Sequence, residues 1–245
     1  KNEKQFIKHF TAFLKREKIG FDIVIGQKRY DGPIEDLLIE QNVNVLVKVN
    51  TEKPLYASYF GPHTTINEFP PLLENTDVYL LSASKNRIDE IKTGKLPKST
   101  YRDNETKKNI NVTINDDFSE LTLRAVNSFK GHEKGNQQYD RLLYSDYVNE
   151  DYKKYDTASW VDFFRVEKYK TKYSQELKAL NDKLKIKQKE WFKESAKAEY
   201  GCENIEDYTY SIDSNGRFSL DSYFTFTENF NAKNDLIRKA GPNYI

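Results

Sequence analysis

Hydrophobic and polar residues follow two different periods along the first fifty positions. Over residues 3–18 the apolar positions recur every three or four residues, and Gly20 follows. This spacing is typical of an amphipathic helix that a glycine terminates. Over residues 42–50 every second residue is valine, which predicts a strand with one apolar face. Residues 21–25 predict a shorter strand between these two elements.

The middle of the chain gives shorter patterns. Residues 78–81 predict a strand that leads into a helix at about Asn86–Lys92, and alternating Ile and Val over 110–114 predict another strand. The next apolar residues have helical spacing, so we predict a helix that begins after Asp116 and ends at Gly131. Residues 34–39 fit either a strand or a single helical turn.

The last third of the chain predicts one long helix and a hairpin. Ser174 can cap a helix that runs to about Tyr200. One narrow stripe of this helix, at near-heptad spacing, consists of Leu177, Leu180, Leu184 and Trp191. We interpret the stripe as core packing, and the alternative is a face presented to a partner. Asn215-Gly216 predicts the turn between strands over 208–212 and 217–227.

Together these elements predict an α+β fold. It has a mixed sheet, an N-terminal amphipathic helix, a long C-terminal helix and a terminal β-hairpin. The glycine-containing stretch 131–139 is the best boundary candidate. We therefore expect an α/β lobe over 1–130, a Tyr-rich connecting region over 131–173, and the long helix with the hairpin over 174–245. One continuous domain is the alternative.

Composition narrows the classes of protein. The chain has 17 Tyr and 15 Phe, which a disordered chain would lack. Its 39 Lys and Arg balance 38 Asp and Glu, so no basic excess points to nonspecific nucleic-acid binding. Lys, Asn, Ile and Tyr have AT-rich codons and are abundant, which indicates an AT-rich bacterial genome or one of its phages or mobile elements.

The cysteine count and the hydropathy pattern favour a cytoplasmic protein. Cys202 is the only cysteine, so no intrachain disulfide can form. No apolar run approaches the length of a transmembrane helix, and no apolar signal-peptide core follows the first residues. We therefore expect a soluble protein without a membrane partner.

Aromatic residues provide candidate binding positions. Residues 51–76 predict a long Pro-rich loop, and such loops are often functional. Residues 140–173 mix tyrosines with both acids and lysines, which is more typical of a protein-binding surface than of a nucleic-acid groove. The candidate binding residues are Tyr56, Tyr59, Phe60, Tyr144, Tyr147, Trp160 and Trp191.

Catalytic signals are sparse. The three histidines lie far apart, the single Cys has no neighbouring ligand, and no phosphate-binding glycine loop occurs, so we expect no metal and no cofactor. His63 lies on the Pro-rich loop between aromatic residues and is a candidate general base.

Residues 3–50 resemble the start of a PD-(D/E)xK nuclease. The resemblance consists of a leading amphipathic helix, a turn acid at Asp31 and a strand that carries Lys48. It implies a Mg²⁺ site with two carboxylates and a lysine that orients the attacking water. The position of the second acid is Leu46 in this chain.

The sequence therefore favours a non-catalytic protein-binding or accessory protein. The Trp191 helix followed by the Gly216-Arg-Phe-Ser-Leu hairpin is similar to bacterial toxin-immunity proteins, and a phage or mobile-element component is an equal possibility. We expect another protein as partner. The alternative is a divergent PD-(D/E)xK-like nuclease that uses Asp31, Lys48 and Mg²⁺, or another nucleic-acid-binding protein.

Overall fold

The computed structural model describes residues 3–59, 61–84, 87–233, 239–240 and 243–244. These residues form two compact units. Unit 1 comprises Lys1–Glu105, Lys130–Asn136 and Gly216–Ser222, and unit 2 comprises Thr106–Phe129, Gln137–Asn215 and Tyr223–Ile245. The predicted three-part division of the chain stays a prediction.

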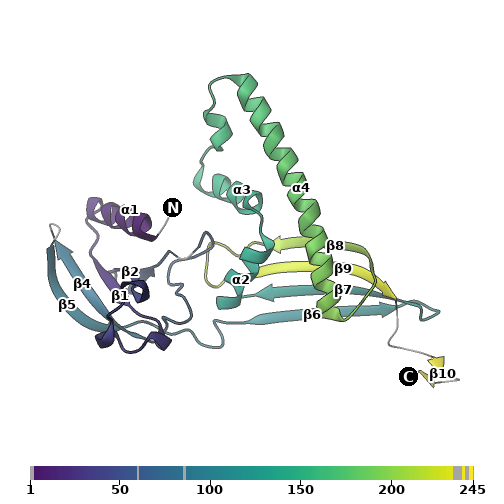
Figure 1. The fold of residues 1–245 in the computed structure, drawn as a ribbon, viewed down its shortest axis with the longest axis horizontal. Helices are drawn as coiled ribbons and strands as arrows, with labels where there is room; N and C mark the ends of the chain where they lie inside the picture. Colours follow the sequence, from purple (N-terminus) through teal and green to yellow (C-terminus); the bar gives the residue numbers. More distant parts are fainter. Residues whose placement is uncertain (1–2, 60, 85–86, 234–238, 241–242, 245) are drawn as a thin grey trace. The chain divides into compact units, whose positions relative to one another are not determined.

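After an N-terminal helix the chain forms a run of strands, then a run of helices and then a final run of strands (Figure 1). The α-helices are α1 (Glu3–Arg16), α2 (His132–Arg141), α3 (Tyr144–Tyr155) and α4 (Glu167–Tyr200). The strands are β1 (Phe21–Gly26), β2 (Asn44–Val49), β3 (Leu55–Ala57), β4 (Asp77–Ser84), β5 (Arg87–Lys95), β6 (Thr106–Ile114), β7 (Glu120–Phe129), β8 (Ile205–Ser214), β9 (Phe224–Lys233), β10 (Lys239–Ala240) and β11 (Asn243–Tyr244). Short 3₁₀ turns are η1 (Arg29–Asp31), η2 (Ile34–Asp36), η3 (Glu40–Asn42) and η4 (Trp160–Phe163).

Unit 1 is built on a five-stranded antiparallel sheet in the order β3-β2-β1-β4-β5. Successive side chains of β2 point to opposite faces of this sheet, and each face packs against a different part of unit 1. Val47 and Val49 point to one face, where they pack with Leu14 of α1. Leu46 points to the other face and is buried with Phe69, which comes from the loop before β4. The predicted helix over 3–18 and the predicted valine strand are thus confirmed.

Unit 2 is built on a four-stranded antiparallel sheet in the order β6-β7-β9-β8. The last third of α4 packs on this sheet: Phe192 contacts the rings of Tyr210 and Phe226, with ring centroids 4.8 Å and 5.3 Å away. The first part of α4 extends away from the sheet, as the green helix in Figure 1 shows. The only buried residues of α4 are Gln188, Phe192 and Ala196.

A carboxylate lies in the core of unit 2. Glu228 on β9 is 3% exposed and accepts hydrogen bonds from the hydroxyls of Tyr200 at 2.8 Å and Tyr208 at 2.9 Å. Burial, together with the negative charge of Glu228, raises the pKa of both phenols well above its usual value. Buried ionisable groups need such partners, because an unpaired charge in the core is strongly destabilising.

The α+β class, the N-terminal helix, the long helix and the C-terminal hairpin are confirmed. The sheet differs from the prediction, because strands β1–β9 form two separate antiparallel sheets instead of one mixed sheet, and β10 pairs with β11. The long helix also begins earlier than predicted, at Glu167 instead of Ser174. Residues 34–39, left open between strand and helical turn, contain the 3₁₀ turn η2.

Two predicted helices are strands. The helix predicted over Asn86–Lys92 is β5, which pairs with β4 as a hairpin, and Asn86 itself lies outside the described residues. The helix predicted after Asp116 is β7, which forms ladders with β6 on one side and β9 on the other. Its buried residues follow at intervals of two, at Leu123, Ala125 and Asn127, as a strand requires.

The hairpin is longer and more open than predicted. Nine residues, 215–223, connect β8 with β9 in place of a tight Asn-Gly turn. Carbonyl groups of this connection, at Ser219 and Leu220, accept hydrogen bonds from the buried ammonium of Lys134 at 2.8 Å and 3.5 Å. Since a tertiary contact holds the connection, local turn preference does not set its length.

Within the part of the chain that the structure describes, no helix has both the length and the apolar character needed to cross a membrane.

Candidate functional site

Unit 1 contains a cavity of about 360 Å³. One part of its wall is apolar and includes Pro54, Tyr56, Phe69, Pro97 and Leu220. The rings of Tyr56 and Phe69 meet edge to face, with centroids 5.5 Å apart. The rest of the wall is polar and comprises Asn67, Glu68, Glu74, Lys98, Ser99, Asp103, Asn104, Lys130, Gly131, His132 and Asp221. A cavity with a largely apolar wall and a few converging polar groups is the usual form of a small-ligand site.

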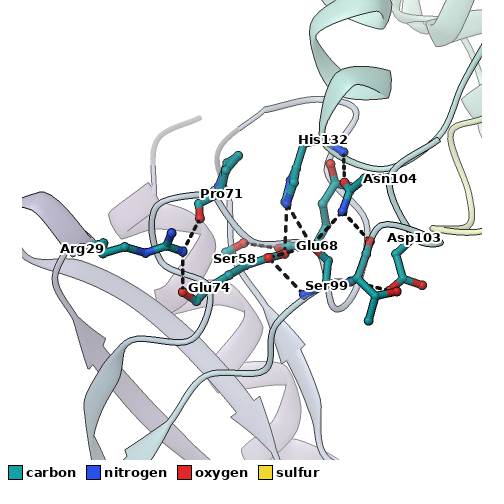
Figure 2. A network of polar contacts seen from close by, with 10 residues as sticks. Arg29, Ser58, Glu68, Pro71, Glu74, Ser99, Asp103, Asn104 and His132 are labelled. Atoms are coloured by element: carbon teal, nitrogen blue, oxygen red, sulfur yellow. Dashed lines mark hydrogen bonds and ion pairs between the residues drawn. The ribbon is translucent and has the colours of Figure 1, made fainter. Parts of the chain in front are cut away.

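One side of the cavity is organised around Glu74 (Figure 2). Its Oε2 accepts hydrogen bonds from the backbone N–H of Ser99 at 3.0 Å and from the Ser99 hydroxyl at 2.7 Å. Its Oε1 lies 3.0 Å from Nε2 of His132. The Asn104 amide donates to Ser99 Oγ at 2.8 Å, and Asn104 Oδ1 accepts the backbone N–H of His132 at 2.9 Å. Both oxygens of Glu74 are therefore occupied by protein groups.

The close approach at the start of α2 requires glycine. Gly131 has φ +75°, and a Cβ there would lie 2.3 Å from Asn104 Oδ1 and 2.5 Å from the Asp103 carbonyl oxygen. Real Cβ atoms do not come so close, so any other residue would displace the segment that carries Asn104. Asp103 is fixed in turn by the backbone N–H and the hydroxyl of Thr100, and these hydrogen bonds lower its pKa.

Glu68 is the most buried acid of the cavity wall, at 8% exposure. Its Oε2 accepts hydrogen bonds from the N–H and the hydroxyl of Thr65, both at 2.9 Å. Its Oε1 accepts no hydrogen bond from any residue that the structure describes. Ser58 holds the backbone at this point by donating to the Glu68 carbonyl at 2.9 Å.

Lys134 on α2 is a second buried charge in unit 1. It is 1% exposed, and its ammonium donates to the carbonyls of Ser219 and Leu220. Burial lowers the pKa of Lys134 below its usual value, and the negative charges of Glu68 and Asp221 partly oppose that shift. The negative charge of Glu68 therefore favours the charged form of Lys134, although the two side chains form no direct ion pair.

Ser99, His132 and Glu74 do not form a nucleophilic triad. In a triad the imidazole accepts the serine proton with one nitrogen and contacts the acid with the other. Here Nε2 of His132 faces both Glu74 and Ser99, the latter at 3.3 Å, and the Ser99 hydroxyl donates to Glu74. The arrangement orients hydrogen-bonding groups around a cavity. Within the described ranges no cluster of three or more His, Cys, Asp or Glu side chains is arranged to hold a metal ion.

Unit 2 exposes apolar residues along α4. Leu180, Leu184 and Trp191 are 53%, 38% and 49% exposed, so the stripe interpreted from the sequence as core packing faces solvent over most of its length. The interpretation was wrong because the face of α4 that packs on the sheet is a neighbouring one, which carries Gln188 and Phe192.

The other predicted binding residues of unit 2 lie near α4 in the chain. Tyr144 begins α3, is 58% exposed and packs edge to face on Tyr147, which is partly buried against the core of unit 2. Trp160 begins η4, is 45% exposed and contacts Phe164 and Tyr173 with centroids 5.7 Å and 6.0 Å away.

The predicted binding residues of unit 1 are only partly brought together. Tyr56 lines the cavity. Tyr59 stacks on Phe6 of α1, with centroids 5.7 Å apart. Phe60 lies outside the described residues.

The residues predicted for catalysis lie apart. Lys48 pairs in register with Asp22 and forms an ion pair with it at 3.3 Å. Asp31 is exposed in η1, held near Gln27 at the other end of β1, since Gln27 Nε2 donates to the Asp31 carbonyl at 3.0 Å. Gly26, which precedes Gln27, pairs with Asn44 on β2. Lys48 lies four residues further along β2, or about 13 Å away. The strand register therefore does not bring Asp31 and Lys48 together.

His63 is buried in unit 1, at 4% exposure. The carbonyl of the preceding residue, Pro62, accepts a hydrogen bond from the Arg217 guanidinium. Leu46, at the second acid position of the nuclease resemblance, is 1% exposed in the apolar cluster under the sheet.

Sequence reasoning missed Glu68, Glu74, Ser99 and His132. One local signal existed: Thr65 and Glu68 have the T-x-x-E spacing in which the threonine donates to the acid three residues later. The others meet only through the fold, because residues 74, 99 and 132 lie far apart in the chain.

Comparison with protein-family models, curated proteins and solved structures gave no match to this chain.

Proposed function

We propose that this chain is a non-catalytic protein-binding protein that docks an acidic amphipathic helix of another protein along α4. The observation that carries the proposal is the exposure of Leu180, Leu184 and Trp191 on a helix whose first 21 residues, Glu167–Lys187, include no buried residue. Those 21 residues span about 31 Å. Over this length α4 buries little surface in the core of unit 2, so its apolar side chains remain available to bind a partner.

The spacing of the stripe favours a helical partner. Leu177, Leu180, Leu184 and Trp191 follow each other at intervals of three, four and seven residues, which is the pattern of a coiled-coil seam. Covering the exposed parts of the last three side chains would contribute about 5 kcal/mol from apolar burial. Association costs about 4–15 kcal/mol, so the stripe alone supports only weak binding. A specific complex needs a further contribution.

Charge supplies that contribution and selects the partner. The α4 sequence has ten lysines against six acidic residues, an excess of four positive charges. Lys178, Lys183 and Lys187 form no ion pair with any described residue. A second copy of α4 would bring the same positive excess, whereas an acidic helix would be attracted and oriented by it. Charge complementarity therefore favours a different, acidic protein over self-association.

A designed peptide tests the surface directly. The probe is a synthetic acidic helix of about three heptads, with Leu at the seam and Glu beside it, and its control is the same peptide with Lys for Glu. Trp191 reports binding by its fluorescence in a Trp160→Phe background, because covering the indole shifts its emission to the blue. We expect a saturable shift with the acidic peptide only. Leu180→Asp and Leu184→Asp should abolish the shift.

Ile186 provides a matched control on the same helix. It is 62% exposed but follows Leu184 by two residues, which places it about 160° round the helix from the stripe. Ile186→Asp should leave peptide binding unchanged. An equal loss in Ile186→Asp, or an equal shift with the basic peptide, would contradict the proposal. A dimer of the chain that Leu180→Asp dissociates, measured by sedimentation, would replace it with self-association.

The finer predictions remain part of this proposal. An immunity-like protein or a phage or mobile-element component fits a dedicated protein binder, and the single cysteine fits the cytoplasm. The nuclease alternative stays a prediction that depends on Asp31 and Lys48.

A further inference from the structure

The cavity of unit 1 has no part in the docking of a helix on α4, and its wall contains a buried acid, Glu68, with one oxygen that no described group occupies. Glu68 is more than nine-tenths buried, and only its Oε2 is occupied, by Thr65. No described group donates a hydrogen bond to Oε1, and this oxygen keeps contact with solvent. A positively charged donor group of a ligand can therefore replace solvent at Oε1 of Glu68 and form a charge-assisted hydrogen bond there.

Among the other charged groups of the wall, Glu74, Lys130 and Asp221 have protein partners, whereas Lys98 and Asp103 are exposed. Glu74 has both oxygens occupied by Ser99 and His132. The ammonium of Lys130 lies 3.0 Å from a carboxylate oxygen of Asp221. Glu68 is therefore the buried acid of the wall with an oxygen that no described group occupies, and the wall as a whole carries more acidic than basic side chains.

The apolar side of the wall indicates what else the ligand carries. Tyr56 and Phe69 present adjoining rings, and Pro54 adds to the same side. Aromatic rings beside a carboxylate suit an organic cation, since the ring faces attract positive charge and also cover apolar carbon. The volume of about 360 Å³ is near the lower limit of ligand pockets, which suits a small molecule.

We propose that the unit 1 cavity binds a small organic ammonium ion, with Glu68 Oε1 accepting from the ammonium group and Tyr56 and Phe69 packing on its apolar part. The site is a binding site and includes no reaction step. It is separate from the α4 surface, so either proposal can fail without the other.

The full chain and three matched probes test this assignment. 2-Phenylethylamine is the cationic probe, 2-phenylethanol the neutral one and 3-phenylpropanoate the anionic one. Binding is measured by titration with isotope-labelled protein and amide NMR. We expect the amine to bind at least about tenfold more tightly than the alcohol, because the hydrogen bond to Glu68 is charge-assisted. The amide signals of Thr65, Glu68 and Ser99 should shift with the amine.

Two variants separate Glu68 from general negative charge. Glu68→Gln keeps an oxygen for Thr65 but removes the charge, so the preference for the amine over the alcohol should disappear. Asp77→Asn removes an exposed acid of unit 1 that does not line the cavity and should keep the preference. If Glu68→Gln does not fold, the amide shifts that the amine causes in the unmodified chain show whether it binds in the cavity.

Three results would overturn the assignment: tighter binding of 3-phenylpropanoate, an amine preference that survives in Glu68→Gln, or amine-induced shifts that avoid the cavity.

Discussion

Replacing Tyr208 with Phe should destabilise unit 2 by an amount that depends on pH. The Tyr208 side chain is 2% exposed, and its hydroxyl donates to the buried carboxylate of Glu228 at 2.9 Å. A hydrogen bond to a charged group contributes about 1.5–3 kcal/mol. Near neutral pH we therefore expect Tyr208→Phe to lower the free energy of unfolding by about 2 kcal/mol.

Alkaline pH should remove this difference. The pKa of Tyr208 is raised in the folded protein by burial and by Glu228, whereas in the unfolded chain the phenol ionises at about pH 10. Above that pH unfolding releases the Tyr208 proton, so the stability that Tyr208 contributes falls by about 1.4 kcal/mol per pH unit. By about pH 11.5 the loss reaches about 2 kcal/mol, and the variant should match the unmodified protein.

Urea unfolding followed by tryptophan fluorescence measures this effect in the correct part of the molecule. Both tryptophans, Trp160 and Trp191, lie in unit 2, so their emission reports on that unit. Tyr169→Phe is the control, because Tyr169 is 51% exposed on α4 and should show no difference at any pH. A stability difference between Tyr208→Phe and the unmodified protein that stays constant from about pH 8 to 11.5 would refute the linkage between Tyr208 and Glu228.

Three further outcomes can be checked by calorimetry. Gly131→Ala should destabilise unit 1 by at least about 2 kcal/mol, because a Cβ would meet Asn104 Oδ1 at 2.3 Å; an unchanged transition would contradict the left-handed conformation. Gly135→Ala should stabilise α2 by about 0.5–1 kcal/mol, since the only heavy atom near the new Cβ is a Glu68 oxygen at 3.8 Å. Mg²⁺ at about 10 mM should leave the melting temperature unchanged, whereas an increase that Asp31→Ala and Lys48→Ala abolish would favour the nuclease alternative.

Elements with a strong local pattern could be predicted from the sequence. The helix α1 and the strand β2 have clear periods of about 3.6 and 2, and both occur where expected. β7 has apolar residues that fit both periods, because Leu121 and Ala125 are four apart while Leu123 and Ala125 are two apart. Its neighbours β6 and β9 decide the outcome, and the sequence does not show which strands will be its neighbours.

The same limit applies to the sites. The heptad spacing on α4 was visible, but whether the stripe is covered depends on which face of the helix meets the sheet at Phe192. The cavity joins residues from position 54 to position 221, and its central contact, between Glu74 and His132, spans 58 positions (132 − 74). Contacts of this kind depend on topology, so neither composition nor local spacing could predict them.

Unit 1 is assembled from three separate stretches, and the last of them is Gly216–Ser222. A ribosome that synthesises this chain has to add more than two hundred residues before the carbonyls of Ser219 and Leu220 can receive the Lys134 ammonium. Unit 1 therefore becomes complete only after most of the unit 2 sequence has been synthesised. A truncated chain that ends before residue 216 should leave a buried lysine unsatisfied, and such nascent fragments should depend on chaperones until the final segment arrives.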